Sequence, residues 1–284
     1  MDKQTLLAAL TGTLASDQQI RKHSEQQLHA FEQQPGFTAY LLDLITDATE
    51  NQPGVKTAAA IFFKNRVVNY WVVPENKQHT AFYLSETEKS SIKEKLVSTL
   101  FATYKIQQIR LQLSTALNTI LSYDKWDELT NIIQKLLSDE SNIDHVFTGL
   151  ICLYEYTKNY RWAGFELNNF VNPILEEITQ KLFPQLENLA NKSIESDNKV
   201  ADEMLYLIIK IFKFTSYSSL PTYFQDSNNL GKWCQIHVLI ISKPLPKDVL
   251  EEDHIESRNS HPRVKTVKWC FANMNRLLSR HGGG

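Results

Sequence analysis

The side chains best suited to bind a metal ion or transfer protons gather in one acidic segment, residues 243–262. It contains the carboxylates and imidazoles of Glu251, Glu252, Asp253, His254, Glu256 and His261. Carboxylate oxygens and imidazole nitrogens are common ligands of zinc in proteins. The spacing of these residues follows no established metal-ligand pattern, and a solvated acidic loop is the preferred interpretation. We therefore expect no metal site and no cofactor.

No motif of a known catalytic mechanism accompanies this segment. The sequence contains no glycine-rich phosphate loop, no HExxH zinc motif and no GxSxG nucleophile turn. His23 and His29 are six residues apart, so they do not share a helix face as an i,i+4 pair would. We expect no catalytic residues and a protein that is not an enzyme. An all-helical enzyme that uses the segment around His254 remains an alternative.

Lysines and aromatic residues in the apolar regions could bind a partner. Lys210 and Lys213 interrupt an apolar segment, and we expect their ammonium groups to reach solvent from its rim. Four aromatic residues could stack on nucleobases, but no basic stripe accompanies them in the sequence: Tyr154, Tyr156, Tyr160 and Trp162. The chain has 30 Lys and Arg against 32 Asp and Glu. Its near-neutral charge therefore gives no sign of direct nucleic-acid binding.

Cysteine usage and hydropathy bear on the compartment. Cys152, Cys234 and Cys270 lie far apart and form no CxxC pair, so reduced thiols in the cytosol or nucleus are expected. The N-terminal segment 1–17 makes a poor signal peptide because its apolar run is short and interrupted. Two lysines break the longest apolar run, so we expect no membrane insertion.

The helical spacing of apolar residues dominates the chain, while strict alternation is scarce. Asp17 is a candidate N-cap, Pro35-Gly36 ends a helix, and Ser85 with Glu88 forms a capping-box pattern. The pattern predicts six helix pairs: 6–14 with 17–31, 37–46 with 53–71, 85–104 with 107–121, 125–138 with 142–160, 165–193 with 198–219, and 229–242 with 263–281.

These pairs predict an all-α fold. Their length of roughly 35 to 55 residues is typical of HEAT or armadillo repeats, which stack into a right-handed α-α superhelix. A large non-repetitive helical bundle is the alternative. Only 9 glycines and 9 prolines argue against a fold with many tight turns, such as a β-sandwich or propeller. A polar insert at 74–84 and the acidic segment 243–262 are expected to interrupt the stack, the latter as a flexible excursion.

Five segments, in order along nearly the whole chain, resemble the importin-β family. Arg21-x-x-Ser24-Glu25-x-x-Leu28 is similar to the opening of the importin-β N-terminal domain, although Ser24 replaces the usual Ala. The others are residues 59–71, 108–113, 149–160 and 264–278, and the last two resemble the importin seven and eight branch. Phe63 stands where Leu is common in the family, and Arg263 and Thr266 depart from the pattern of this branch.

The resemblance implies a fragment of a longer nuclear transport receptor. Such karyopherins are HEAT superhelices that bind protein cargo and phenylalanine-glycine nucleoporins, and are unloaded by the GTP form of the GTPase Ran. They shuttle between cytoplasm and nucleus through the nuclear pore. Residues 1–124 would form the importin-β N-terminal domain with repeats 1–3 and the Ran-binding region, and residues 125–284 would form repeats 4–6. A HEAT scaffold or adaptor without Ran dependence is the alternative function.

The resemblance also implies where partners bind. The Ran site would lie on the inner helices of the first repeats, at Arg21, Glu25, Lys64, Asn65 and Arg110. Arg21 and Glu25 could instead support their own helix as an i,i+4 pair, and Asn65 could hydrogen-bond a neighbouring turn. A nucleoporin slot between the outer helices of pairs five and six would use Ile178, Leu182 and Trp233, although packing between repeats uses the same residue types.

Overall fold

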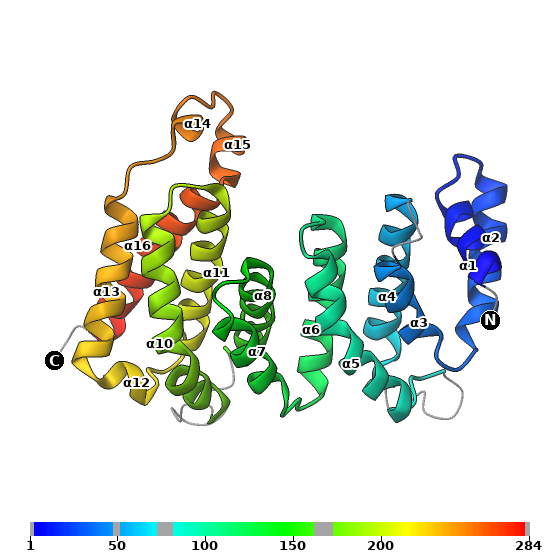
Figure 1. The fold of residues 1–284 in the computed structure, drawn as a ribbon, viewed down its shortest axis with the longest axis horizontal. Coiled ribbons are helices and arrows are strands. Elements are labelled where there is room, and N and C mark those ends of the chain that lie inside the picture. Colours follow the sequence, from blue (N-terminus) through cyan, green and yellow to red (C-terminus); the bar gives the residue numbers. More distant parts are fainter. Residues whose placement is uncertain (1–2, 48–51, 73–81, 162–172, 282–284) are drawn as a thin grey trace. The chain divides into compact units, whose positions relative to one another are not determined.

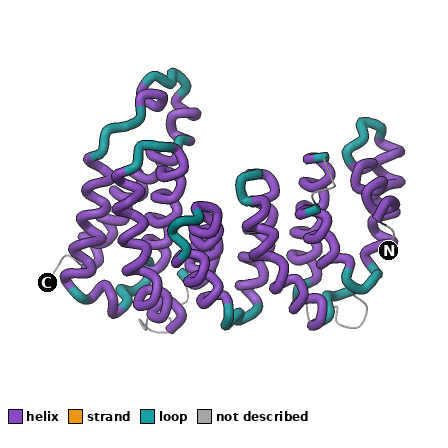
Figure 2. The backbone as a smooth tube through the Cα atoms, in the orientation of Figure 1, coloured by secondary structure: helices purple, strands orange, loops and turns teal. Residues whose placement is uncertain are grey.

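The described residues of the chain are all-helical (Figures 1 and 2). The computed structural model describes residues 3–47, 52–72, 82–161 and 173–281, and no strand occurs among them. Contacts divide the chain into two compact units, Met1–Trp126 and Asp127–Gly284. None of the described helices is long and apolar enough to cross a membrane.

The first unit consists of three helix pairs. Its helices are α1 (Lys3–Thr13), α2 (Gln18–Glu32), α3 (Phe37–Thr46), α4 (Pro53–Tyr70), α5 (Glu86–Thr103) and α6 (Gln107–Tyr123). The first helices of the second and third pairs, α3 and α5, pack side by side, and so do their second helices, α4 and α6. The unit therefore has two layers. We call the layer of α4 and α6 the B layer of the first unit.

The second unit repeats this arrangement with three further pairs. Its described helices are α7 (Leu129–Ser138), α8 (Ile143–Tyr160), α10 (Pro173–Glu195), α11 (Lys199–Thr215), α12 (Thr222–Gln225), α13 (Ser227–Ser242), α14 (Lys247–Leu250), α15 (Ile255–Ser260) and α16 (Pro262–His281). Helices α8, α11 and α16 pack side by side as the B layer of this unit, opposite α7, α10 and α13. The prediction of an all-α fold built from six helix pairs is confirmed.

The predicted capping residues lie at the N-termini of their helices. The Oδ1 of Asp17 accepts hydrogen bonds from the backbone amides of Gln19 and Ile20 at 2.7 and 3.2 Å, which caps α2. Ser85 Oγ accepts the amide of Glu88 at 3.3 Å and caps α5. The return bond of a capping box is absent here, because the Glu88 carboxylate accepts the amide of Thr38 at 3.0 Å instead and links α5 to α3.

Each unit has an apolar interior. Apolar residues at helical spacing, such as Phe63 and Val67 of α4 and Leu113 of α6, are fully buried. In the second unit, aromatic rings form much of the core: Phe212 stacks on Trp233 with ring centroids 5.3 Å apart, and Phe183 lies 5.0 Å from Trp233. These contacts join α10, α11 and α13.

Two predicted segments differ from the structure. The excursion at 243–262 contains two short helices that were not predicted, α14 and α15, which stand beyond the ends of α13 and α16 in Figure 1. The helix predicted at 165–193 is described from Pro173 onward. Residues 162–172, with Trp162, lie outside the described residues, and so do residues 74–81 of the predicted polar insert.

Candidate partner-binding surfaces

The B layer of the first unit presents a mixed apolar and polar surface. On α4, Ile61, Asn65 and Val68 follow one another at i, i+4 and i+7, so they share one face, and all three are exposed. On the neighbouring α6, Leu111 is 63% exposed. Exposed apolar residues beside polar ones are typical of surfaces that bind proteins.

A groove of about 360 Å³ lies between α2 and α4, next to this surface. Its lining residues are Thr13, Glu25, His29, Glu32, Phe62, Asn65, Arg66, Asn69 and Tyr70. Two of the predicted Ran-binding residues, Glu25 and Asn65, therefore lie at the same groove. Its walls offer two carboxylates, two amides and aromatic surface, which suits hydrogen bonding with a polar protein segment.

Arg66 fixes the inner wall of this groove. Its Nε donates to Thr38 Oγ1 at 2.8 Å, and its Nη2 donates to the backbone oxygen of Glu32 at 2.9 Å. The guanidinium carbon lies 5.1 Å from the ring centroid of Phe37 and 5.4 Å from that of Tyr70. Burial lowers the pKa of Arg66, an effect opposed by the Glu32 carboxylate. This one side chain ties the end of α2 to α3 and α4.

The structure gives the predicted Ran-binding residues different surroundings. Arg21 donates to the backbone oxygens of Ala15 and Ser16, each at 2.7 Å, and so satisfies carbonyls that follow α1. The i,i+4 ion pair considered for Arg21 and Glu25 does not form. Lys64 donates to Asn65 Oδ1, and in the described part of the chain Asn65 forms no hydrogen bond with a neighbouring turn.

Arg110 lies in the first turn of α6 and does not line the groove. It is half-buried on a helix that packs directly beside α4. Among the described residues, no side-chain hydrogen bond or ion pair within the chain engages its guanidinium, which is therefore available to a partner.

The apolar slot predicted in the second unit is packed interior. Ile178, Leu182 and Trp233 each have 0% of their surface exposed, because α10 and α13 pack against one another. The structure gives these residues a packing role, and their contact with nucleoporins stays a prediction.

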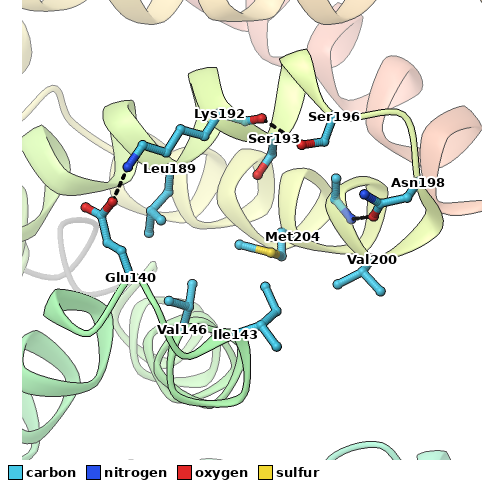
Figure 3. Close-up of a pocket in the computed structure, with 11 residues that line it drawn as sticks. Glu140, Ile143, Val146, Leu189, Lys192, Ser193, Ser196, Asn198, Val200 and Met204 are labelled. Atoms are coloured by element: carbon cyan, nitrogen blue, oxygen red, sulfur yellow. Dashed lines mark hydrogen bonds and ion pairs between the residues drawn. The ribbon is translucent and has the colours of Figure 1, made fainter.

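A separate pocket of about 460 Å³ opens in the second unit near the turns that join α7 to α8 and α10 to α11 (Figure 3). Val146, Leu189 and Met204 supply apolar walls, and Ile143 is exposed at 46%. Lys192 and Glu140 form an ion pair on one side, which lowers the pKa of Glu140. The pocket could hold an apolar side chain, and the polar side chains of Lys192, Ser196 and Asn198 at its edge already form hydrogen bonds within the chain.

The B layer of the second unit carries a cluster of cations that the sequence analysis missed. We call it the basic stripe, and it consists of Lys158, Arg161, Lys210, Lys213, Arg276 and Arg280. These residues come from α8 and its C-terminal end, α11 and α16. All of them except Lys158 lie over the rings of Phe214, Tyr217 or Trp269. Of the four aromatic residues considered in the sequence analysis, Tyr154 is the one that a described cation of the stripe approaches, with Lys158 Nζ 5.8 Å from its ring centroid.

In the described part of the chain, the cysteines and the candidate metal ligands do not form a reactive or metal-binding cluster. Cys152, Cys234 and Cys270 are free, and burial raises the pKa of both Cys152 and Cys270 to about 12. Among the described residues, no group of three or more His, Cys, Asp or Glu side chains is arranged to hold a metal ion. His254 and Glu252 instead make a local bond, from the His254 amide to the carboxylate at 2.9 Å.

Comparisons with known proteins identify relatives of this chain. Residues 24–102, from α2 to the end of α5, match the importin-beta N-terminal domain. Nonsense-mediated mRNA decay protein 5 of Saccharomyces cerevisiae is 34% identical over 295 residues, which cover 99% of this chain and 28% of that protein. Importin-8 of Homo sapiens is 25% identical over 289 residues, which cover 99% of this chain and 27% of that protein.

A solved structure shares the fold. The exportin Cse1 in its cargo-free, cytoplasmic state superposes with a TM-score of 0.78 at 19% identity, over 98% of this chain and 30% of that one. The likeness shows a HEAT-type helical solenoid. The chain spans less than a third of the length of each of these three relatives.

Proposed function

The chain belongs to the importin-β family, and from this premise we propose that it is the N-terminal region of a nuclear transport receptor that binds Ran in its GTP form. Two observations carry the proposal. The chain is 34% identical, over 99% of its length, to nonsense-mediated mRNA decay protein 5 of yeast, and its residues 24–102 match the importin-beta N-terminal domain. Members of this family bind Ran-GTP and cargo, and importins and exportins shuttle between nucleus and cytoplasm. The family is one of transport receptors rather than enzymes.

The B layer of the first unit is the surface we propose for Ran. Lys64 and Asn65 of α4 and Arg110 of α6 lie on neighbouring helices of one layer, and Glu25 joins Asn65 at the groove. Charged and polar groups of this kind would set the register of a partner and speed its association. The exposed Ile61, Val68 and Leu111 would supply apolar contact area among them. Arg21 would act by holding the end of α1 rather than by touching Ran.

The direct test is nucleotide-dependent binding. The purified chain would be titrated with Ran loaded with a non-hydrolysable GTP analogue or with GDP, and complex formation would be followed by fluorescence anisotropy. We expect binding at least about tenfold tighter for the GTP form, a coupling of about 1.4 kcal/mol. Equal affinity for both forms would overturn the proposal and favour a HEAT scaffold without Ran dependence.

Charge reversal separates the proposed surface from the rest of the unit. Lys64→Glu combined with Arg110→Glu should weaken Ran-GTP binding at least tenfold while the melting temperature stays unchanged. Lys95→Glu is the matched control because Lys95 lies on α5, in the other layer. If the control weakens binding as much as the double variant does, the B layer is not the Ran surface.

Nucleoporin and cargo binding complete the proposal. Because Ile178, Leu182 and Trp233 are buried, a nucleoporin phenylalanine could reach them only if α10 and α13 separated. Protein cargo would bind to a receptor much longer than this chain, since its relatives extend well beyond the aligned region.

A further inference from the structure

We propose that the basic stripe of the second unit is a binding site for an acidic, carboxylate-rich peptide segment of a partner protein. The site goes beyond the Ran surface proposed above, because it lies on the other unit and does not depend on Ran. It names the chemical class of partner that the B layer of the second unit would take.

Helical spacing brings the cations together. Lys158 and Arg161 are three residues apart at the end of α8, and Lys210 and Lys213 are three apart on α11. Residues three or four apart lie on one helix face. Because the three helices pack side by side, their cationic faces join into one stripe. Arg276 and Arg280 complete it on α16 with a separation of four residues.

Trp269 is the centre of the stripe. The Nζ atoms of Lys210 and Lys213 lie 3.9 and 3.7 Å from the centroid of its ring. Two ammonium groups thus share one indole, whose π-electrons attract both. The tryptophan stabilises two like charges at close range and so holds them ready for an anion.

Neighbouring carboxylates do not neutralise most of the stripe. Among the described residues, no carboxylate lies within 4 Å of the cationic nitrogens of Lys210, Lys213, Arg276 or Arg280, whereas Lys158 has an ion pair with Glu155 at 3.2 Å. Burial, with Lys213, Arg161 and Lys158 nearby, lowers the pKa of Lys210 to about 8.

Arg276 of α16 is, like Lys210, a partly buried cation with a lowered pKa. Burial and the nearby Arg280 lower the pKa of Arg276 to about 10. Its Nη2 donates to Ser216 Oγ at 2.9 Å, but its buried Nε has no hydrogen-bond partner among the described residues. Uncompensated positive charge around a partly buried donor is the arrangement that a bound anion would relieve.

The arrangement of the rings favours carboxylates over nucleic acid. Two lysines occupy Trp269, and the guanidinium carbons of Arg276 and Arg280 each lie 5.5 Å from the centroid of Tyr217. Aromatic faces that already bind cations are not open to stacked bases, on which single-stranded nucleic-acid binding depends. The cations also extend over three helices, so several carboxylates along one peptide could each find a cationic partner.

A peptide titration tests the proposal on the intact chain. A fluorescent twelve-residue peptide rich in Glu and Asp would be compared with the same peptide carrying Gln and Asn at those positions. We expect the acidic peptide to bind at least tenfold more tightly, with an affinity that falls as salt rises. Equal binding of both peptides would overturn the proposal, and so would tighter binding of a single-stranded oligonucleotide of equal charge.

Matched variants locate the site. Lys213→Glu with Arg280→Glu should weaken binding of the acidic peptide at least tenfold, whereas Lys268→Glu should leave it within twofold. Lys268 is an exposed residue of α16, next to Trp269 in sequence, but its side chain points about 100° away from that of Trp269 around the helix axis. If the charge reversals unfold the chain, Lys213→Gln with Arg280→Gln takes their place, with a smaller expected loss.

Binding that is unchanged in the stripe variants, or equally reduced in Lys268→Glu, would place the peptide elsewhere and overturn the inference. Ran-GTP binding by the same stripe variants serves as an independent readout. We expect it to be unchanged, so failure of the peptide site and failure of the Ran proposal remain distinguishable.

Discussion

The side-chain amide of Asn273 lies 3.1 Å from Nε2 of His237, and both residues are completely buried. The amide nitrogen also donates to the backbone oxygen of Ile209 at 3.3 Å, and His237 Nδ1 lies 2.7 Å from the backbone oxygen of Trp233. Because Asn273 donates to Nε2, the imidazole is neutral and carries its proton on Nδ1. The pair joins α11, α13 and α16 through polar groups inside an apolar core.

This imidazole should make stability depend on pH. Burial lowers the pKa of His237 from 6.5 to about 4. The unfolded chain therefore binds a proton at higher pH than the folded chain does, and stability is lost as pH falls from 6.5 towards 4. The free energy of unfolding should drop by roughly 3 kcal/mol over this interval from this group. Urea denaturation at several pH values measures the drop.

His237→Gln removes the titrating group, so it should flatten this part of the pH profile. The exposed His23→Gln should leave it unchanged. An equally steep profile in His237→Gln would show that another group is responsible.

The ion pair between α16 and α11 should be sensitive to loss of one partner. Arg263 Nε donates to Asp202 Oδ1 at 2.6 Å, and the two side chains are only 1% and 3% exposed. Asp202→Ala leaves an unpaired buried guanidinium and should cost about 3–5 kcal/mol in urea denaturation. The double variant Asp202→Leu with Arg263→Met should recover most of that loss. A single variant within 1 kcal/mol of the parent chain would contradict this reading of the pair.

Two glycines should respond oppositely to alanine. A β-carbon at Gly12 would lie 1.9 Å from Ser24 Oγ, because α1 and α2 cross closely there. Gly12→Ala should therefore destabilise the chain by about 1–3 kcal/mol. At the exposed Gly231 of α13 nothing lies within 4 Å, so Gly231→Ala should stabilise it by about 0.5–1 kcal/mol. Thermal unfolding of both variants tests the pair of signs, and a stabilising Gly12→Ala would refute the close crossing.

Shortening the side chains that were predicted to bind nucleoporins should reveal their packing role in the second unit. Trp233→Ala should cost about 3–5 kcal/mol and Ile178→Val about 0.5–1.5 kcal/mol, because both side chains are fully buried. Chemical denaturation measures both changes. A loss below 1 kcal/mol for Trp233→Ala would mean that this site opens readily, as nucleoporin binding there would require.

Helix positions could be predicted from the sequence because they depend on local order. Apolar residues at spacings of three and four, with Asp17 and Ser85 as caps, placed the helix pairs to within a few residues. The short helices α14 and α15 escaped prediction because segments of four and six residues carry too little periodicity. The role of Glu88 was also missed, since its partner Thr38 lies 50 positions away in the sequence.

The candidate sites were less accessible to sequence reasoning. Lys210 and Lys213 had been noted only as isolated lysines in an apolar segment. Their significance depends on Trp269 of α16 and on Arg161 after α8, which only the packing of three helices brings near. Likewise, nothing local distinguishes the buried Ile178 from an exposed residue that could line a slot. Side-by-side packing of helices decides both cases.

The depressed pKa of Lys210 has a chemical consequence. Because burial and the neighbouring cations lower the pKa of Lys210 to about 8, more of its side chain should be free amine at neutral pH than in an ordinary lysine. Lys210 should therefore acylate faster per unit of accessible surface than an ordinary exposed lysine. A carboxylate bound beside Lys210 would favour the protonated ammonium form. The acylation rate of Lys210 would therefore fall when an acidic peptide binds.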